Sequence, residues 1–460
     1  MGEARDCVGA FVEAACVPLD AGHASGTLDD ARAILASDPG LAGRSIHAAA
    51  ILGDDIAVRG WLEKDAGLAT SKGGPRGWDA LTYLCFSRYL RLDEGRSEAF
   101  VRAATALLDA GADPNGGWYE NNHRPEPEWE SALYGAAGVA HHEGLTRLLL
   151  ARGADPNDGE TPYHAPESYE MGVLRALVES GRLNDESLAT ILLRKTDWHH
   201  YEAIRWLLEQ GVDPNRMTHW GKTALHNALV SDNSLGIIEV LLEHGADPAL
   251  LGDSGHGWRG PRLSSVAIAA RRGRRDVLDL LERRGVPLGL EGVERLIAAC
   301  ARGDADGIRS VTNEEPGLVG ELLAEGGTLL AEFAGNGNTG GVSSLLDLGV
   351  DVDAVYARGD GYFGIAPNST ALHVASWKAR HDTVRLLIDR GAAIDAVHGI
   401  GRTPLLLAVK ACVDSYWTYR RAADSVAALL SAGASVRGVP YPSGFSEVDA
   451  LLESHGASRT

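Results

Sequence analysis

The chain has 460 residues, of which 45% are hydrophobic, and its 63 acidic and 43 basic side chains give a formal net charge of −20 at pH 7. This balance weighs against a nucleic-acid partner, because phosphate binding needs clustered cations, and it favours a basic partner over an acidic one. No uninterrupted apolar run reaches the length of a membrane-spanning helix, so no membrane partner is expected.

A short motif returns along the chain, each time after a helical run rich in leucine. Gly-Ala-Asp-Pro-Asn or a close variant of it occupies residues 111–115, 153–157, 211–215 and 245–249. In a second frame, Thr370-Ala-Leu-His and Thr403-Pro-Leu-Leu begin 33 residues apart. A fixed period of this length indicates a repeat architecture. The pattern resembles the ankyrin repeat, and the resemblance covers nearly the whole chain.

The resemblance implies an all-α ankyrin-repeat solenoid, built of stacked helix-turn-helix units that carry projecting loops, called fingers here. A Thr or Ser before the first apolar run caps a helix, and a Gly 21 residues later ends the second helix, as in Ser264 with Gly285 and Thr328 with Gly349. Asp-Pro then turns the chain into the finger. A single unit cannot bury its own apolar residues, so the units must stack.

In chain order, the first two junctions, 38–42 and 65–69, use a connector without the Asp-Pro-Asn sequence, and so does the junction at 315–319. The unit at 161–184 contains Pro166, so its first helix should be short or broken. The chain holds about a dozen units in all, several of them degenerate. The clearest units occupy residues 131–157, 219–249, 264–289, 328–353, 370–395 and 403–437.

Residues 285–293 have no finger and run straight into the next helix, which suggests a seam near residue 290. We therefore expect two domains, an N-terminal ankyrin-repeat arc at 1–290 and a C-terminal arc at 291–460. The last helix, at 447–454, should cap the C-terminal arc.

Five insertions depart from the repeat frame, at residues 87–100, 116–129, 251–261, 356–364 and 412–423. Of the ten tryptophans, only Trp61 and Trp206 occupy positions on second helices that look buried. Aromatic rings on fingers and first helices are costly to expose and are typical of binding surfaces, here with polar side chains between them. Alternatively, the rings pack on one another as a small core under the loops. The predicted binding residues are Trp78, Trp118, Tyr119, Asn121, Asn122, His123, Trp129, Trp220, Trp258, Arg259, Asp360, Tyr362, Trp377, His381 and Trp417.

Chemical motifs give little support to catalysis. Residues 359–364 match Gly-x-Gly-x-x-Gly, but a dinucleotide site needs a strand before that motif, and here it lies on a finger. The basic run 271–275 is expected to be solvated at a helix–helix turn. The resemblance implies a structural hydrogen bond between turns for His47, His164, His226 and His373. The histidines left for a metal or for acid–base work are His123, His199, His200, His219, His256 and His381.

These remaining histidines lie on different repeats, apart from one adjacent pair whose side chains diverge on a helix. A zinc site needs three or four converging ligands, so we expect no metal and no cofactor. The five cysteines are scattered, odd in number and without a Cys-x-x-Cys pair, as is typical of core residues in a reducing compartment. The first residues lack the basic region of a signal peptide, so we expect a cytoplasmic protein.

The favoured hypothesis is a non-catalytic scaffold that holds a protein or peptide on its concave, aromatic-rich face, as the resemblance implies. The alternative is an enzyme or a receptor for a small-molecule ligand, with a pocket in the concave groove closed by the long fingers 116–130 and 354–369. In that case His123, Asp360, Tyr362 or His381 would carry out acid–base chemistry. The sequence identifies no catalytic residue beyond these candidates.

Overall fold

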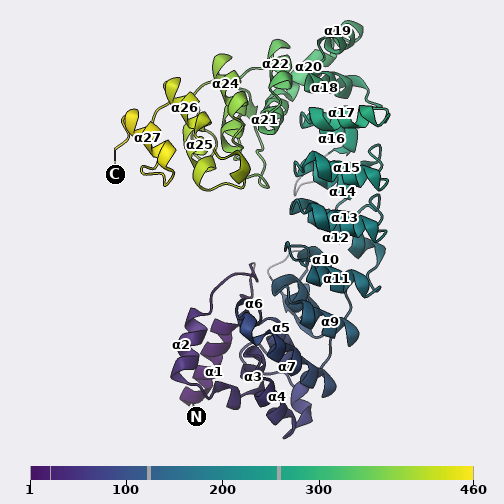
Figure 1. The fold of residues 1–460 in the computed structure, drawn as a ribbon, viewed down its shortest axis with the longest axis vertical. Helices are drawn as coiled ribbons and strands as arrows, with labels where there is room; N and C mark the ends of the chain where they lie inside the picture. Colours follow the sequence, from purple (N-terminus) through teal and green to yellow (C-terminus); the bar gives the residue numbers. More distant parts are fainter. Residues whose placement is uncertain (1, 21, 122–125, 256–260, 459–460) are drawn as a thin grey trace. The chain divides into compact units, whose positions relative to one another are not determined.

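The computed structural model describes residues 2–20, 22–121, 126–255 and 261–458. The chain divides into two compact units, Met1–His219 and Trp220–Thr460. Within each unit, pairs of short antiparallel helices stack in chain order, and fingers join one pair to the next (Figure 1). This confirms the predicted all-α ankyrin solenoid.

The first unit contains thirteen described α-helices and one two-stranded hairpin. The helices are α1 (Gly2–Ala15), α2 (Asp29–Ser37), α3 (Ile46–Ile51), α4 (Asp55–Leu62), α5 (Ala80–Cys85), α6 (Arg88–Leu92), α7 (Ser97–Asp109), α8 (Ala132–Tyr134), α9 (Glu143–Ala151), α10 (Glu160–His164), α11 (Gly172–Glu179), α12 (Asp185–Asp197) and α13 (Tyr201–Glu209). The strands are β1 (Gly117–Glu120) and β2 (Glu128–Ser131). Short helical turns at Leu41–Gly43 and Ala66–Ala69 form the two atypical connectors near the N-terminus.

The second unit contains fourteen described α-helices and two more hairpins. The helices are α14 (Ala224–Val230), α15 (Leu235–Glu243), α16 (Ser265–Arg271), α17 (Arg275–Arg283), α18 (Gly292–Arg302), α19 (Ala305–Glu314), α20 (Leu318–Ala324), α21 (Gly326–Asn336), α22 (Thr339–Asp347), α23 (Ala371–Trp377), α24 (His381–Asp389), α25 (Pro404–Val413), α26 (Asp424–Ser431) and α27 (Ser446–Ser454). The strands are β3 (Leu251–Asp253), β4 (Arg262–Ser264), β5 (Val355–Tyr356) and β6 (Ser369–Thr370).

Two first helices begin where their capping residues predict, whereas α21 begins at Gly326, two residues before Thr328, which was predicted to cap it. The Ser264 hydroxyl accepts a hydrogen bond from the backbone N–H of Ala267 at 3.2 Å, and the Thr403 hydroxyl accepts one from Leu406 at 3.3 Å. Gly285 and Gly391, after the second helices, have φ of 70° and 83°, a conformation that glycine adopts without strain. As predicted, α10 is only five residues long, and α27 ends the second unit.

First helices of successive units pack side by side, as α21, α23 and α25 do in the second unit. Most of their alanines and leucines are buried there, because only a neighbouring unit can cover them. The helices α17 and α18, on either side of residue 290, also pack together. The seam expected near that residue thus lies inside the second compact unit, and its effect on unfolding stays a prediction.

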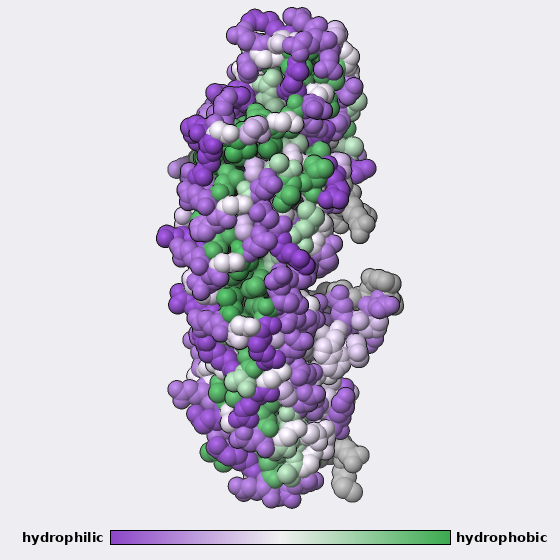
Figure 2. Space-filling model, turned by 90° about the vertical axis from the view of Figure 1, so that its right-hand side faces the viewer, coloured by the Kyte–Doolittle hydropathy of each residue, from purple (hydrophilic) through white to green (hydrophobic). Residues whose placement is uncertain are grey.

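The fingers contribute little strand, as predicted. Each of the three hairpins is antiparallel and two-stranded, with Trp118 opposite Glu130, Gly252 opposite Leu263 and Tyr356 opposite Ser369. None of the helices within the described ranges is both long enough and apolar enough to cross a membrane. On the face drawn in Figure 2, hydrophobic residues gather in groups between hydrophilic ones.

Candidate functional site

In the second unit, the finger between β5 and β6 folds back onto the first helices. The Asp360 carboxylate accepts hydrogen bonds from the backbone N–H groups of Tyr362 at 3.0 Å and Phe363 at 3.4 Å, so it shapes a tight turn. The indole N–H of Trp377, on α23, donates to the Phe363 carbonyl at 2.6 Å. Asp360 and Trp377 therefore act on the finger itself, which they fold and hold against the helix.

The folded finger inserts one ring into the interior. Phe363 is 4% exposed and forms a small hydrophobic cluster with Ala331, Ile365 and Val374. Trp417 packs against this cluster from the inserted loop between α25 and α26, with its ring centroid 6.1 Å from that of Phe363. Two insertions that are distant in sequence are thus brought together over the first helices.

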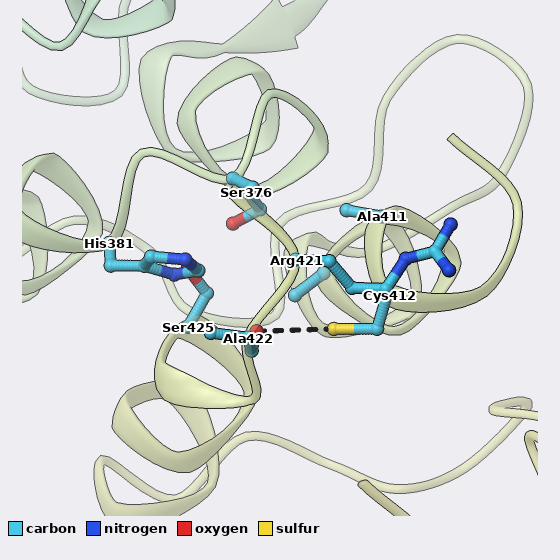
Figure 3. A pocket seen from close by; sticks show the side chains of 9 residues that line it. Ser376, His381, Ala411, Cys412, Arg421, Ala422 and Ser425 are labelled. Carbon is cyan, nitrogen blue, oxygen red and sulfur yellow. Dashed lines mark hydrogen bonds between the residues drawn. The ribbon is translucent and has the colours of Figure 1, made fainter. Parts of the chain in front are cut away.

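His381, at the start of α24, anchors the inserted loop. Its Nε2 lies 3.0 Å from the carbonyl oxygen of Arg420, and its Nδ1 lies 2.8 Å from the Ser425 hydroxyl. Figure 3 shows His381 beside Ser425, and the Cys412 thiol donating to the carbonyl of Ala422. The space between these residues is too narrow to admit a water molecule. Both ring nitrogens of His381 are thus engaged within the scaffold.

The loop and the finger expose aromatic rings next to this packed region. Tyr416 is 79% exposed, Tyr419 is 77% exposed and Tyr362 is 38% exposed. The Arg420 guanidinium lies over the rings of Trp417, at 4.8 Å, and Tyr419, at 4.7 Å. We call Tyr362, Tyr416, Trp417 and Tyr419 the aromatic surface.

A buried charge network lies under the finger. Asp232 accepts from Lys378 at 2.5 Å, from Arg272 at 2.8 Å and from the Asn336 amide at 3.1 Å. Arg272 also pairs with Glu332 at 3.2 Å. The Lys378 ammonium, on a side chain that is 2% exposed, lies 3.8 Å from the Phe363 ring centroid. The finger therefore closes over an ion network that four repeat units share.

Burial and charge oppose each other at Asp232. Burial alone would raise the pKa of this carboxyl, but Arg272 and Lys378 lower the pKa well below its usual range. The carboxylate is therefore ionised and fully paired. Burial raises the pKa of Glu332, whose oxygen accepts a hydrogen bond from the Tyr356 hydroxyl at 3.2 Å.

The first unit places its predicted aromatic residues differently. Trp78 is 5% exposed and Trp118 is 7% exposed, and their rings stack with centroids 5.1 Å apart. Phe86 and Tyr134 complete this cluster, which belongs to the hydrophobic core. Trp78 and Trp118 thus follow the alternative hypothesis, in which the rings pack on one another as a core. The prediction that only Trp61 and Trp206 look buried was wrong. The physical reason for Trp118 is that its finger folds back as a hairpin and turns one face inward, where the ring stacks on Trp78.

The opposite face of that hairpin points outward. Tyr119 is 61% exposed, and its ring lies edge-on to Trp129 at 4.7 Å. Asn121 is exposed, and Trp220 is half-buried in the second unit. Asn122, His123, Trp258 and Arg259 lie outside the described residues.

The basic run at 271–275 was expected to be solvated, and this was wrong for two of its members. Arg272 is 7% exposed and Arg274 is 6% exposed. Arg274 donates to the carbonyl of Asn233 at 2.9 Å and pairs with Asp276. Carboxylates on neighbouring turns compensate these buried charges, and single-sequence reasoning had no means to pair residues of different repeats.

The structural histidines are confirmed at three of four positions. His226 bonds to the Leu250 carbonyl at 3.0 Å, His373 to that of Ala396 at 3.0 Å, and His47 to that of Ser71 at 3.4 Å. His164 instead pairs with Glu160 at 3.3 Å and Glu167 at 3.2 Å. The short helix α10 explains the difference, because that unit lacks the usual turn.

An open groove of about 540 Å³ lies along α18 and α19. Arg295, Arg302 and Glu314 are on its walls, and none of the predicted site residues lines it. Sequence reasoning also missed the exposed Tyr416 and Tyr419, although both lie in an insertion that it had singled out.

Comparisons with known proteins agree with this architecture. The profile described as "Ankyrin repeats (many copies)" matches residues 192–242, and that described as "Ankyrin repeat" matches residues 368–398. Cyclin-dependent kinase 4 inhibitor B of Bos taurus is 35% identical over 133 residues, which cover 27% of this chain and 97% of that protein. Ankyrin repeat and SOCS box protein 16 of Mus musculus is 28% identical over 176 residues, 27% of this chain and 38% of that protein.

Among solved structures, the human ASB11 ankyrin repeat domain is 18% identical, with a TM-score of 0.27, and the match covers 58% of this chain and 99% of that domain. One conclusion follows from the repeat motif, the stacked helix pairs and the bovine relative, which is matched along almost its whole length. The chain belongs to the ankyrin-repeat family.

Proposed function

We propose that this chain is a non-catalytic scaffold that binds a protein partner through the aromatic surface of its second unit. The observation that carries the proposal is the exposure of Tyr416, at 79%, and Tyr419, at 77%, on a loop that the scaffold holds in place. Large rings exposed together on one surface are typical of anchors in protein interfaces.

The loop is held in place before any partner binds. His381 holds its backbone at Arg420, and Trp417 packs on the cluster around Phe363. Little conformational freedom is then lost on binding, which favours affinity. The two tyrosines present apolar rings and hydroxyl groups, whereas Arg420 and Arg421 add positive charge. The docked segment should thus be apolar or acidic, while the net charge of −20 draws in a protein that is basic overall.

The relatives fit this proposal. Cyclin-dependent kinase 4 inhibitor B is named for its action on another protein, and its repeats match part of this chain. We extend from it only the class of partner, a protein, and propose that the first helices and their fingers form the binding face.

The test compares the full-length chain with the double variant Y416A/Y419A as bait in a native lysate. The matched control is I56A, which removes a side chain that is 76% exposed in the first unit. We expect a protein that wild type and I56A retain and the double variant loses, with each tyrosine contributing about 1–4 kcal/mol to binding and little to thermal stability.

The captured protein is then purified, and its affinity for the three chains is measured by calorimetry. Equal affinity for wild type and Y416A/Y419A would contradict the proposed surface. Metabolites recovered in the bound fraction, with no protein, would favour the small-molecule receptor predicted as the alternative.

A further inference from the structure

The hairpin of the first unit gathers carboxylates on its inner face. In the β1–β2 register, Glu120 lies opposite Glu128, and Glu130 lies opposite Trp118. Side chains alternate along a strand, so Glu128 and Glu130 share one face of β2. The helix α10 packs against β2 and adds Glu160 from its first turn.

Three of these carboxylates converge. One oxygen each from Glu128, Glu130 and Glu160 lie within 4.8 Å of one another. Carboxylate oxygens bind Ca²⁺ at about 2.3–2.6 Å in a flexible coordination sphere. The three side chains are therefore close enough for small movements to bring their oxygens onto one ion.

Glu130 shows that charge compensation is missing. Its side chain is 1% exposed, and its Oε2 has no hydrogen-bond partner among the residues that the structure describes. His23 Nδ1, the basic group paired with it, is 4.0 Å away. A buried carboxylate without a hydrogen bond is strongly unfavourable. Glu120, which is also 1% exposed, adds to the negative charge.

The electrostatics point the same way. Burial, then Glu160 and Glu120, raise the pKa of Glu130 to about 8. Burial lowers the pKa of His164, but its hydrogen bonds to Glu160 and Glu167 raise it to about 9, so this one positive charge is shared between two carboxylates. A cation among these carboxylates offsets their mutual repulsion.

We propose that Glu128, Glu130 and Glu160 bind a hard divalent cation of the Ca²⁺ type. An all-oxygen ligand set favours Ca²⁺ over Zn²⁺, which prefers histidine and cysteine. Glu128 is half-buried, which leaves the ion a path from solvent, and waters complete its coordination. The ion joins β2 to α10, so it fixes the hairpin on the repeat that follows it.

The experiment titrates CaCl₂ into the chelator-treated full-length chain by calorimetry, and measures Tm with and without CaCl₂. E130Q keeps the side-chain volume but removes the charge at the centre of the site. E98Q is the matched control, because the Glu98 side chain on α7 is 94% exposed. Terbium emission excited through tryptophan reports the same site, since Trp118 lies opposite Glu130.

We expect Ca²⁺ to raise the Tm of wild type and E98Q, and to displace terbium from both. In E130Q the affinity should fall at least about tenfold, because even the loss of a second-shell partner weakens metal binding by about 10–100-fold. Without metal, E130Q should melt at or above the temperature of wild type, since glutamine keeps the side-chain volume and carries no charge. This separates the loss of a ligand from the loss of the fold.

Three results would overturn the proposal. One is wild-type protein whose Tm and heats do not respond to CaCl₂. Another is an E130Q variant that keeps the wild-type response. The third is E130Q that melts well below wild type without metal, which would make Glu130 a structural partner.

Discussion

Lys378 illustrates how the repeat spacing builds a buried ion network. Arg272 and Lys378 each lie eight residues after the residue that caps their first helix, and Asn336 ends α21 at the equivalent position of its unit, so stacking brings them together. Asp232 lies one step later, with φ of 52°, where two other units have glycine. An aspartate tolerates this left-handed conformation better than most residues, and here its carboxylate meets all three partners.

Trp118 and Tyr119 are neighbours on one strand with opposite roles. Trp118 is 7% exposed within the core, and Tyr119 is 61% exposed. We expect W118A to lower the free energy of unfolding by about 3–5 kcal/mol, as for other large buried aromatics, and Y119A to change it by less than about 0.5 kcal/mol. Urea unfolding of the two variants measures both values. Equal effects would contradict the orientation of the hairpin.

The sequence predicted which segments carry unusual aromatic residues but not which rings are buried. Trp118, Tyr119 and Glu120 alternate in burial because they form a strand, whereas the sequence analysis placed them only on a finger. Side-chain direction on such an insertion depends on its strand register. The register is fixed by contacts with residues on other repeats, which a single sequence does not reveal.

At the scale of elements, a histidine in the first turn of a first helix links the start of that helix to the finger that follows it. His373 Nε2 donates to the carbonyls of Ala396, at 3.0 Å, and Arg402, at 3.1 Å, and its Nδ1 accepts from the backbone N–H of Thr370 at 3.2 Å. The same ring thus holds the start of α23 and the finger that follows it. The bond from Thr370 requires the neutral imidazole, because a protonated Nδ1 cannot accept.

This arrangement predicts that acid destabilises the second unit. Burial, and then His398, lower the pKa of His373 from 6.5 to about 4. The unfolded chain therefore binds more protons than the folded chain between these values, so stability is fully present above pH 6.5 and is lost as the pH falls toward 4. The loss expected from this residue is about 3 kcal/mol.

Urea unfolding between pH 4 and pH 7 measures this loss in wild type and H373Q. The variant should be less stable at pH 7, because glutamine cannot reproduce the ring's contacts. The stability of H373Q should also fall less steeply between pH 6.5 and pH 4, because this variant takes up as much as one proton fewer than wild type on unfolding. Parallel curves for the two chains would show that His373 does not titrate in this range.

Elements with regular capping residues were predicted most accurately. Thr370 and Thr403 come directly before α23 and α25, and glycines come just after the second helices. The three short hairpins in the fingers have no local signal of comparable strength. Their pairing depends on how each finger folds over its own unit, as Phe363 does under the aromatic surface.

At the scale of the molecule, helices pack mainly on those of neighbouring repeats, but the ion network of Asp232 with Lys378 links repeats that are not adjacent. Cooperativity therefore depends both on the coupling of adjacent units and on this network. Contacts divide the chain at His219, whereas the missing finger at 285–293 suggested a seam near 290. Residues 220–290 therefore belong with the C-terminal part if the contacts set the boundary, and with the N-terminal part if the missing finger sets it.

Unfolding can decide between these boundaries. We expect two transitions in urea, because a repeat chain with one weak junction departs from two-state behaviour. L107A, I238A and K378M each remove a side chain that is at most 2% exposed, in α7, in α15 and at the end of α23. The two truncations to alanine should cost about 2–5 kcal/mol. Breaking the buried pair of Lys378 with Asp232 should cost about 3–5 kcal/mol.

The decisive variant is I238A, which lies between the two candidate boundaries. Because the contacts break at His219, I238A should shift the same transition as K378M and leave the transition shifted by L107A unchanged. Circular dichroism and tryptophan fluorescence, recorded on the same samples, assign each transition. If I238A moves with L107A instead, the cooperative boundary lies near residue 290. If all three variants shift a single transition, the chain unfolds as one cooperative body and both boundaries are wrong.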